Sequence, residues 1–168
     1  MSSVSVLRSV VLSITLIGLS FTANVQAKPE QGKKFKDWTT VCETLPKTKK
    51  KICNIFQNVT NDKGTVVMQI AIGYPPNKKE AQALITLPLG VLLQPGIEFK
   101  GGTAKAFRIP FGVCIKSGCV AIAKLDSKII KGMKAGTKGS VKFAAAQKKI
   151  IAIPISLNGF TAAFNSLK

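Results

Sequence analysis

The sequence predicts a mainly β fold, an antiparallel β-sandwich-like single domain with one or two short helices. Short segments rich in β-branched and aromatic residues recur along the chain, and clusters of Gly, Pro, Asn and Asp separate them. Two segments, near residues 127–135 and 159–167, place their apolar residues at helical spacing instead. The chain beyond residue 27 is long enough for one domain with one hydrophobic core.

The first three strands are expected to form hairpins. Residues 35–42 and 52–59 are two of these strands, joined through the charged segment 45–51. Asn61-Asp62-Lys63-Gly64 has the composition of a hairpin turn, after which residues 65–72 run back as the third strand. The chain therefore begins with an antiparallel unit.

Shorter strands follow, separated by turns that contain Pro or Gly. Pro88 and Gly90 interrupt the apolar stretch 84–93, so this stretch is not expected to form a membrane helix. The strands are expected at residues 81–87, 97–100, 104–109, 113–115 and 119–124.

A surface helix is expected after the last of these strands. Asp126 is a typical N-cap, and Gly136 ends a helix over residues 127–135. Pro154 favours an edge position for its strand, because proline cannot donate a ladder hydrogen bond. The remaining elements are expected as strands at 139–145 and 150–157 and a short helix at 159–167.

The apolar alternation of these elements predicts which side chains form the core. The candidates are Trp38, Phe56, Met68, Ile70, Ile85, Phe107, Ile122, Phe143, Ile153 and Phe160.

Residues 1–27 are expected to be a cleaved signal peptide. Arg8 supplies a positive n-region, residues 10–21 an apolar run, and Val25-Gln26-Ala27 a small-residue cleavage site. An uncleaved anchor or a buried helix is the alternative, although the run is short for a bilayer span. Residues 28–34 are expected to be a disordered basic lead-in, and residues 35–168 the β domain. The protein is therefore expected to be periplasmic or envelope-associated, with no transmembrane segment after cleavage.

The chain is strongly basic, with a net charge of +18. Lys is a hydrated point charge that suits diffuse attraction to anionic surfaces. One cluster is the candidate polyanion-binding site, with envelope components or host-surface polyanions as partners; a purely solubilising role for these lysines is the equally favoured interpretation. This cluster consists of Lys47, Lys49, Lys50 and Lys51.

Four cysteines in an exported chain predict two disulfides. Three pairings are formally possible, and the simplest joins Cys42 to Cys53 and Cys114 to Cys119. A four-Cys metal site lacks its usual C-x2-C spacing, and a redox role lacks a C-x-x-C motif. No metal and no cofactor is therefore expected.

Most catalytic arrangements are missing from the sequence. The chain has no His, which excludes Ser-His and Cys-His nucleophiles, and no phosphate-binding or dinucleotide motif is present. A hydrolase or other enzyme with a Ser-Lys or carboxylate site is the alternative to a non-catalytic protein. Specific nucleic-acid binding is not expected, because the aromatic residues are separate from the Lys clusters. Oligomeric state is left open.

Several motifs together resemble the invasion-associated locus B family of Gram-negative bacteria. They are Phe35-Lys36-Asp37-Trp38, Gly73-Tyr74-Pro75-Pro76, the segment 87–96 (LPLGVLLQPG), Ser117-Gly118-Cys119-Val120-Ala121 and the segment 155–163 (ISLNGFTAA). The resemblance implies an exported, β-rich cell-envelope domain, and some members are linked to bacterial entry into host cells. It implies no catalytic residue, so a non-catalytic binding or virulence-associated role is the first functional hypothesis.

Overall fold

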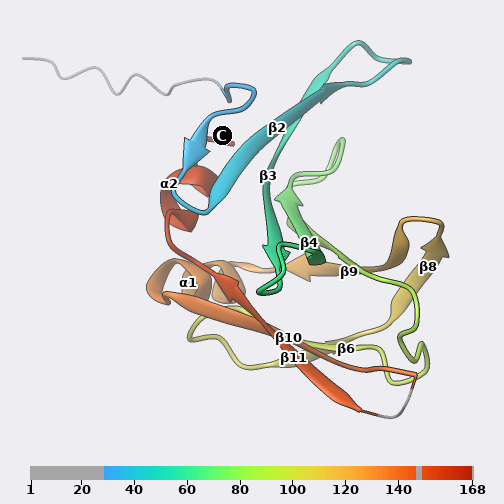
Figure 1. Ribbon diagram of the computed structural model, residues 1–168. Helices are drawn as coiled ribbons and strands as arrows, with labels where there is room; N and C mark the ends of the chain where they lie inside the picture. The colour runs from blue at the N-terminus through green and yellow to red at the C-terminus, as the bar shows by residue number, and fades with distance from the viewer. Residues whose placement is uncertain (1–28, 147–148, 168) are drawn as a thin grey trace, which may run out of the picture.

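Two antiparallel sheets pack against each other in the computed structural model, which describes residues 29–146 and 149–167. In the described chain the larger sheet has seven strands, ordered β1-β2-β3-β4-β5-β9-β8, and the smaller has four, ordered β11-β10-β6-β7 (Figure 1). The predicted antiparallel β fold with short helices is confirmed. The predicted signal peptide lies outside the described residues.

The larger sheet consists of β1 (Lys34–Phe35), β2 (Trp38–Thr44), β3 (Lys51–Thr60), β4 (Val66–Gly73), β5 (Ala81–Leu87), β8 (Phe111–Ile115) and β9 (Gly118–Leu125). The smaller sheet consists of β6 (Ile97–Lys100), β7 (Phe107–Ile109), β10 (Lys138–Ala144) and β11 (Ile150–Ser156). The helices are α1 (Ser127–Ala135) and α2 (Phe160–Asn165). The chain changes sheets after β5, returns after β7, and changes again through α1.

Local signals in the sequence set several of these boundaries. The Asp126 carboxylate accepts a hydrogen bond from the Ile129 N–H at 2.8 Å, which caps α1 at its predicted start. Asn61 accepts the Gly64 N–H through its carbonyl and the Thr65 N–H through its side chain, which closes the predicted β3–β4 turn. Pro154 lies in β11, an edge strand of the smaller sheet, as predicted.

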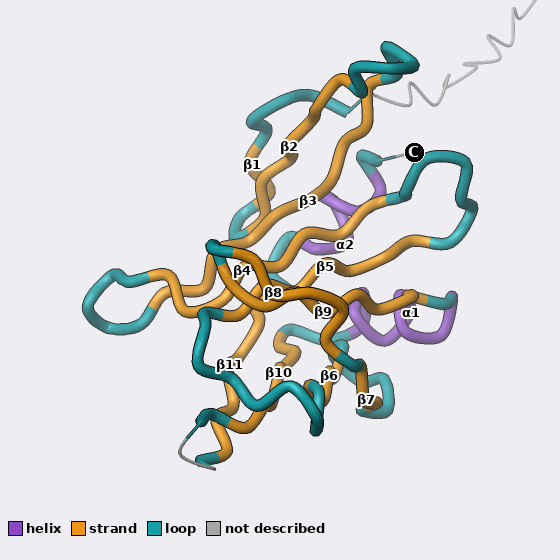
Figure 2. Tube along the Cα trace, turned by 90° about the vertical axis from the view of Figure 1, so that its right-hand side faces the viewer, coloured by secondary structure: helices purple, strands orange, loops and turns teal. Residues whose placement is uncertain are grey.

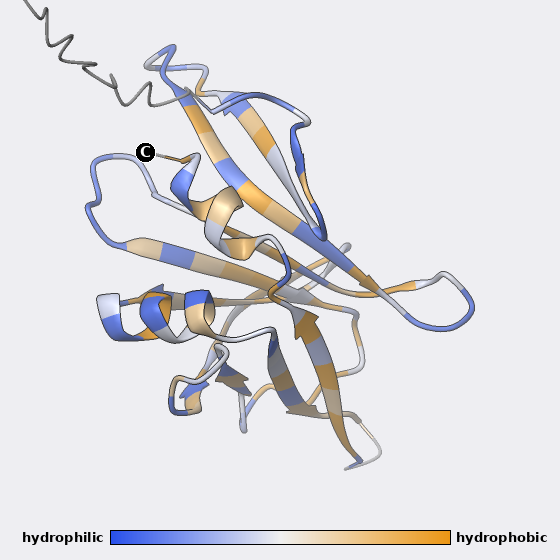
Figure 3. Ribbon diagram, turned by 90° about the vertical axis from the view of Figure 1, so that its left-hand side faces the viewer, coloured by the Kyte–Doolittle hydropathy of each residue, from blue (hydrophilic) through white to orange (hydrophobic). Residues whose placement is uncertain are grey.

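The core lies between the sheets and beneath the two helices. Alternate residues of the strands point inward, and Figure 3 shows the resulting alternation of hydrophobic and hydrophilic positions. Trp38 and Phe160 meet edge to face, with ring centroids 5.5 Å apart, so α2 is packed directly against β2.

Three of the predicted core residues need correction. Ile122 is exposed on the outer face of β9, where Ala121 and Ala123 point inward instead. Phe56 is only partly buried, because Ile55 occupies the inward position of β3; Phe107 is likewise partly buried. In β3 and β9 both faces carry apolar residues, so alternation could not show which face is inward.

The lead-in expected over residues 28–34 is described by the structure from residue 29, and part of its backbone pairs with β2. The Gly32 N–H donates to Thr40 O at 2.7 Å, and the Thr40 N–H donates to Lys33 O at 2.9 Å. Lys34, the first residue of β1, then pairs with Thr39 of β2. The open edge of β2 offers unpaired backbone groups, and this segment satisfies them.

A buried glutamine joins the two sheets. Gln57 in β3 donates through Nε2 to Asp37 O at 3.2 Å and to Ser156 O at 3.1 Å, and its Oε1 accepts the Ser156 N–H at 3.1 Å. The Trp38 indole N–H donates to the same Ser156 carbonyl at 3.0 Å. Gln57 thereby gives the edge strand β11 the pair of hydrogen bonds that a neighbouring strand would give.

Replacing this glutamine should destabilise the protein. Gln57→Ala leaves the Ser156 N–H and the Asp37 carbonyl without their partner, at an expected cost of about 1–3 kcal/mol in the free energy of unfolding. Denaturant unfolding measures this difference. Asn58→Ala, at the exposed neighbouring position, is the control and should change stability much less; equal losses in the two variants would contradict the role assigned to Gln57.

Candidate functional site

The four candidate lysines lie together at the tip of the β2–β3 hairpin. Lys47, Lys49 and Lys50 are in the turn, Lys51 begins β3, and all four are exposed. The turn is closed by the Leu45 N–H donating to Lys50 O and the Lys49 N–H donating to Leu45 O, both at 2.9 Å. The tip of the hairpin projects beyond the other strands of the larger sheet (Figure 1), so it is accessible to a large ligand.

A disulfide holds the two strands beneath this tip. Cys42 and Cys53 face each other in the β2–β3 ladder and are bonded. Cys114 and Cys119 are bonded in the same way across β8 and β9. The structure therefore contains the sequence-local pairing, and each disulfide closes a hairpin. In the part of the chain that the structure describes, no group of three or more His, Cys, Asp or Glu residues could hold a metal ion.

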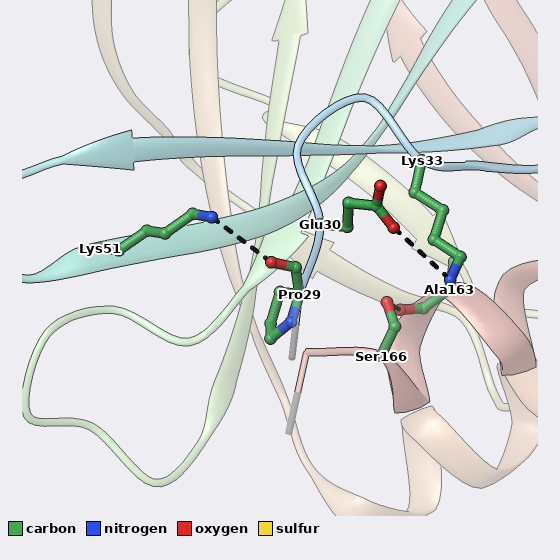
Figure 4. Close-up of polar contacts among 6 residues, drawn as sticks. All are labelled: Pro29, Glu30, Lys33, Lys51, Ala163 and Ser166. Atoms are coloured by element: carbon green, nitrogen blue, oxygen red, sulfur yellow. Dashed lines mark hydrogen bonds and ion pairs between the residues drawn. The ribbon is translucent and has the colours of Figure 1, made fainter. Parts of the chain in front are cut away.

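The charge of the tip is not neutralised within the described residues. In the described residues, ion pairs join Lys33 to Glu30 at 3.9 Å and Lys142 to Glu98 at 3.1 Å. Neither ion pair involves a lysine of the tip. Lys51 Nζ donates to the carbonyl oxygen of Pro29 at 3.5 Å, beside the Lys33–Glu30 pair (Figure 4). The tip thus presents several like charges at close spacing, an arrangement that attracts anions.

A second group of lysines adjoins the hairpin through Tyr74, at the end of β4. One shallow depression, of about 450 Å³, lies between Tyr74 and the pair Lys50 and Lys51. Another, of about 600 Å³, lies between Tyr74 and the helix lysines Lys131 and Lys134, and its lining also includes Lys79 and the acidic residues Glu80 and Asp126. In the sequence Tyr74 precedes two prolines, and nothing there indicates that it lies between the hairpin lysines and the lysines of α1, because the helix is distant along the chain.

Tyr74 is held in place by packing. It is partly buried, and its ring centroid lies 5.7 Å from that of Phe164 in α2. Lys134 Nζ lies 5.4 Å from the Phe164 ring and donates to Asn165 Oδ1 at 2.7 Å. Both depressions are open and shallow, which suits a flexible, charged ligand better than a small substrate that must be enclosed.

Ser156 is one place where the structure brings a serine, a lysine and a carboxylate near one another, as the enzyme alternative would need. Its hydroxyl donates to the Asp37 carboxylate, and Lys138 lies opposite it in the β10–β11 ladder. No hydrogen bond joins Lys138 to Ser156 in the described structure. The backbone of Ser156 is instead hydrogen-bonded to the side chains of Gln57 and Trp38. The geometry is that of a junction between the two sheets, with the hydroxyl–carboxylate bond as one more link.

Comparison with known proteins identifies relatives along the whole domain. The family model described as "Invasion associated locus B (IalB) protein" matches residues 38–168. Invasion protein B homologs of Brucella abortus, from strain 2308 and from biovar 1 (strain 9-941), are each 25% identical over 167 residues, which cover 96% of this chain and 95% of the relative.

A solved structure shares the fold. The crystal structure of invasion associated protein b from Bartonella henselae matches with a TM-score of 0.74 at 20% sequence identity, over 82% of this chain and 95% of that chain.

Neither of the helices that the structure describes here is long and apolar enough to cross a membrane.

Opening the Cys42–Cys53 disulfide should loosen the lysine tip. Replacing both cysteines with Ala is expected to cost about 2–3 kcal/mol of stability and to speed tryptic cleavage at Lys47–Lys51. Replacing Cys114 and Cys119 instead should leave that cleavage rate near the wild-type value.

Non-reducing peptide mapping of the exported wild-type protein should recover both disulfides, and a Cys42–Cys114 peptide would refute the pairing.

Proposed function

The chain belongs to the invasion-associated locus B family, and from this premise we propose that it is an exported, non-catalytic envelope protein that binds polyanions. The binding site is the lysine tip of the β2–β3 hairpin, extended past Tyr74 to the lysines of α1. The observation that carries the proposal is the tip itself, with four exposed lysines on a hairpin that a disulfide holds together.

Export is supported by the disulfides and by family membership. Disulfides persist in oxidising compartments such as the periplasm, and both hairpins that carry cysteines in the described chain are closed by one. The expected signal peptide would direct the chain there.

The ligand is proposed to be an extended anion that makes many weak contacts. Lys attracts phosphate, sulfate and carboxylate groups alike, because its ammonium group is a point charge without a fixed hydrogen-bonding plane. Lipopolysaccharide of the envelope and acidic glycans of a host surface both present such groups. The invasion-associated names of the relatives make the host source worth testing beside the envelope source.

Processing of the leader can be checked directly. We expect the protein recovered from the periplasm to begin at Lys28, because Val25-Gln26-Ala27 fits signal peptidase. N-terminal sequencing measures this, and a mature chain that still begins with Met1 would contradict it.

Neutralising the tip should weaken polyanion binding. Changing Lys47, Lys49, Lys50 and Lys51 to Gln removes four cations from one place, so retention on heparin and affinity for lipopolysaccharide should fall at physiological salt. Wild-type binding should itself fall steeply as salt rises. Stability should change by less than about 0.5 kcal/mol per substitution, since all four side chains are exposed.

A matched control separates the position of the charges from the net charge. The control variant changes Lys100, Lys105, Lys124 and Lys138 to Gln. These four lysines are exposed and lie away from the tip, so the control lowers the net charge by the same amount as the tip variant. If both quadruple variants lose binding equally, net charge alone accounts for the attraction and the hairpin site is refuted. Loss on heparin alone would assign the tip to host glycans, and loss on lipopolysaccharide alone to the envelope.

A further inference from the structure

Exposed aliphatic side chains gather at one end of the molecule. Of the nine large hydrophobic residues that are exposed in the described chain, five lie on three neighbouring segments, and each is between 52% and 67% exposed. They are Leu89, Leu93, Val113, Ile115 and Ile150. We call these five residues the apolar end. Leu89 and Leu93 lie in the loop after β5, Ile150 begins β11, and Val113 and Ile115 lie on β8, on the outer face of the larger sheet.

Backbone contacts bring the three segments together. Residues 88–96 leave β5 beside the β8–β9 turn, where Leu87 pairs with Cys119. The same loop is bonded to the β10–β11 connection, with the Ala146 N–H donating to Gly90 O and the Leu92 N–H donating to Ala144 O, both at 2.8 Å. Figure 2 faces this end and shows the loop passing below β8.

The charge of these segments has one sign. Residues 88–96, 111–118 and 145–150 contain no Asp or Glu, although lysines occur among them. Lys116 and Lys149 are exposed, and Arg108 of β7 donates to Pro95 O at 3.2 Å at the base of the loop. Exposed aliphatic groups are therefore flanked by cations, with no carboxylate in the same loops.

This combination of side chains fits the surface of an anionic bilayer. Aliphatic side chains at loop tips can enter the boundary between headgroups and acyl chains, and flanking lysines then meet anionic headgroups. A second copy of this chain fits less well, because it would bring the same cations together. We propose that the apolar end docks the protein on an anionic membrane surface, with Leu89 and Leu93 entering it.

The lysine tip lies far from this surface. Figures 1 and 2 place the β2–β3 hairpin at the opposite end of the molecule from residues 88–96. Docking through the apolar end would leave the tip directed away from the membrane. The two proposals concern different residues and can fail separately.

Vesicle co-sedimentation tests the docking surface. The purified protein, exported with its own leader, is mixed with phosphatidylcholine vesicles with or without phosphatidylglycerol. We expect binding to depend on phosphatidylglycerol, and the Leu89→Gln/Leu93→Gln variant to bind about tenfold more weakly because it has lost two inserting side chains. Circular dichroism of the variant should match the wild type, since both side chains are exposed.

The control is a second pair of exposed aliphatic residues, outside the loop 88–96. Leu84 and Ile122 face each other on the outer surface of the larger sheet and are 43% and 49% exposed. Leu84→Gln/Ile122→Gln should leave vesicle binding unchanged. Equal losses in the two double variants, or no binding by the wild type, would overturn the proposal.

Two further outcomes would refute membrane docking. In the first, the lysine tip binds the vesicles; in the second, the apolar end is a contact between two copies of the chain. If the four lysine-tip substitutions abolish vesicle binding while Leu89→Gln/Leu93→Gln does not, the polyanion site stands and the docking surface is refuted. If sedimentation equilibrium shows a dimer that Leu89→Gln/Leu93→Gln dissociates, the apolar end is a contact between copies, and membrane docking is refuted.

Discussion

The amide of Gln57 connects the two sheets, together with the Trp38 indole and the hydrogen bond between Ser156 and Asp37. It is buried in β3 of the larger sheet, yet it satisfies both backbone groups of Ser156 on the edge of the smaller one. A buried amide needs such partners, because each unpaired polar group in a dry interior is costly. The contact fixes the relative position of the sheets and places Trp38 against Ser156 and Phe160, which in turn seats α2.

This junction explains why the family motifs are rich in glycine, proline and apolar residues. The motif 155–163 contains Ser156, and it also contains Gly159, whose φ of 82° and contact with the Phe35 carbonyl leave no room for a side chain. The motif 87–96 forms the passage between the sheets. These residues serve the fold.

The proposed functions lie outside that junction, on hairpins and loops. The Cys42–Cys53 disulfide holds the strands beneath the lysine tip, so mutual repulsion of the lysines is opposed by a covalent bond. The apolar end consists of the loop 88–96, which backbone hydrogen bonds connect to the β10–β11 connection, together with residues of β8 and β11. Binding residues on such segments can change without loss of the core, which is why the lysine excess can be particular to this chain.

The sequence alone was enough for features with local causes. The α1 cap at Asp126, the β3–β4 turn and the two short-range disulfides each depend on residues close together in the chain, so their signals survive without knowledge of the fold. The lysine tip was predicted for the same reason. Tertiary structure decided which face of β3 and β9 is buried, how residues 29–34 pair with β2, and that Gln57 meets Ser156. It also brought Tyr74 between two groups of lysines and collected the aliphatic loops at one end. These features join segments far apart in sequence, and only packing of the two sheets sets the distances between them.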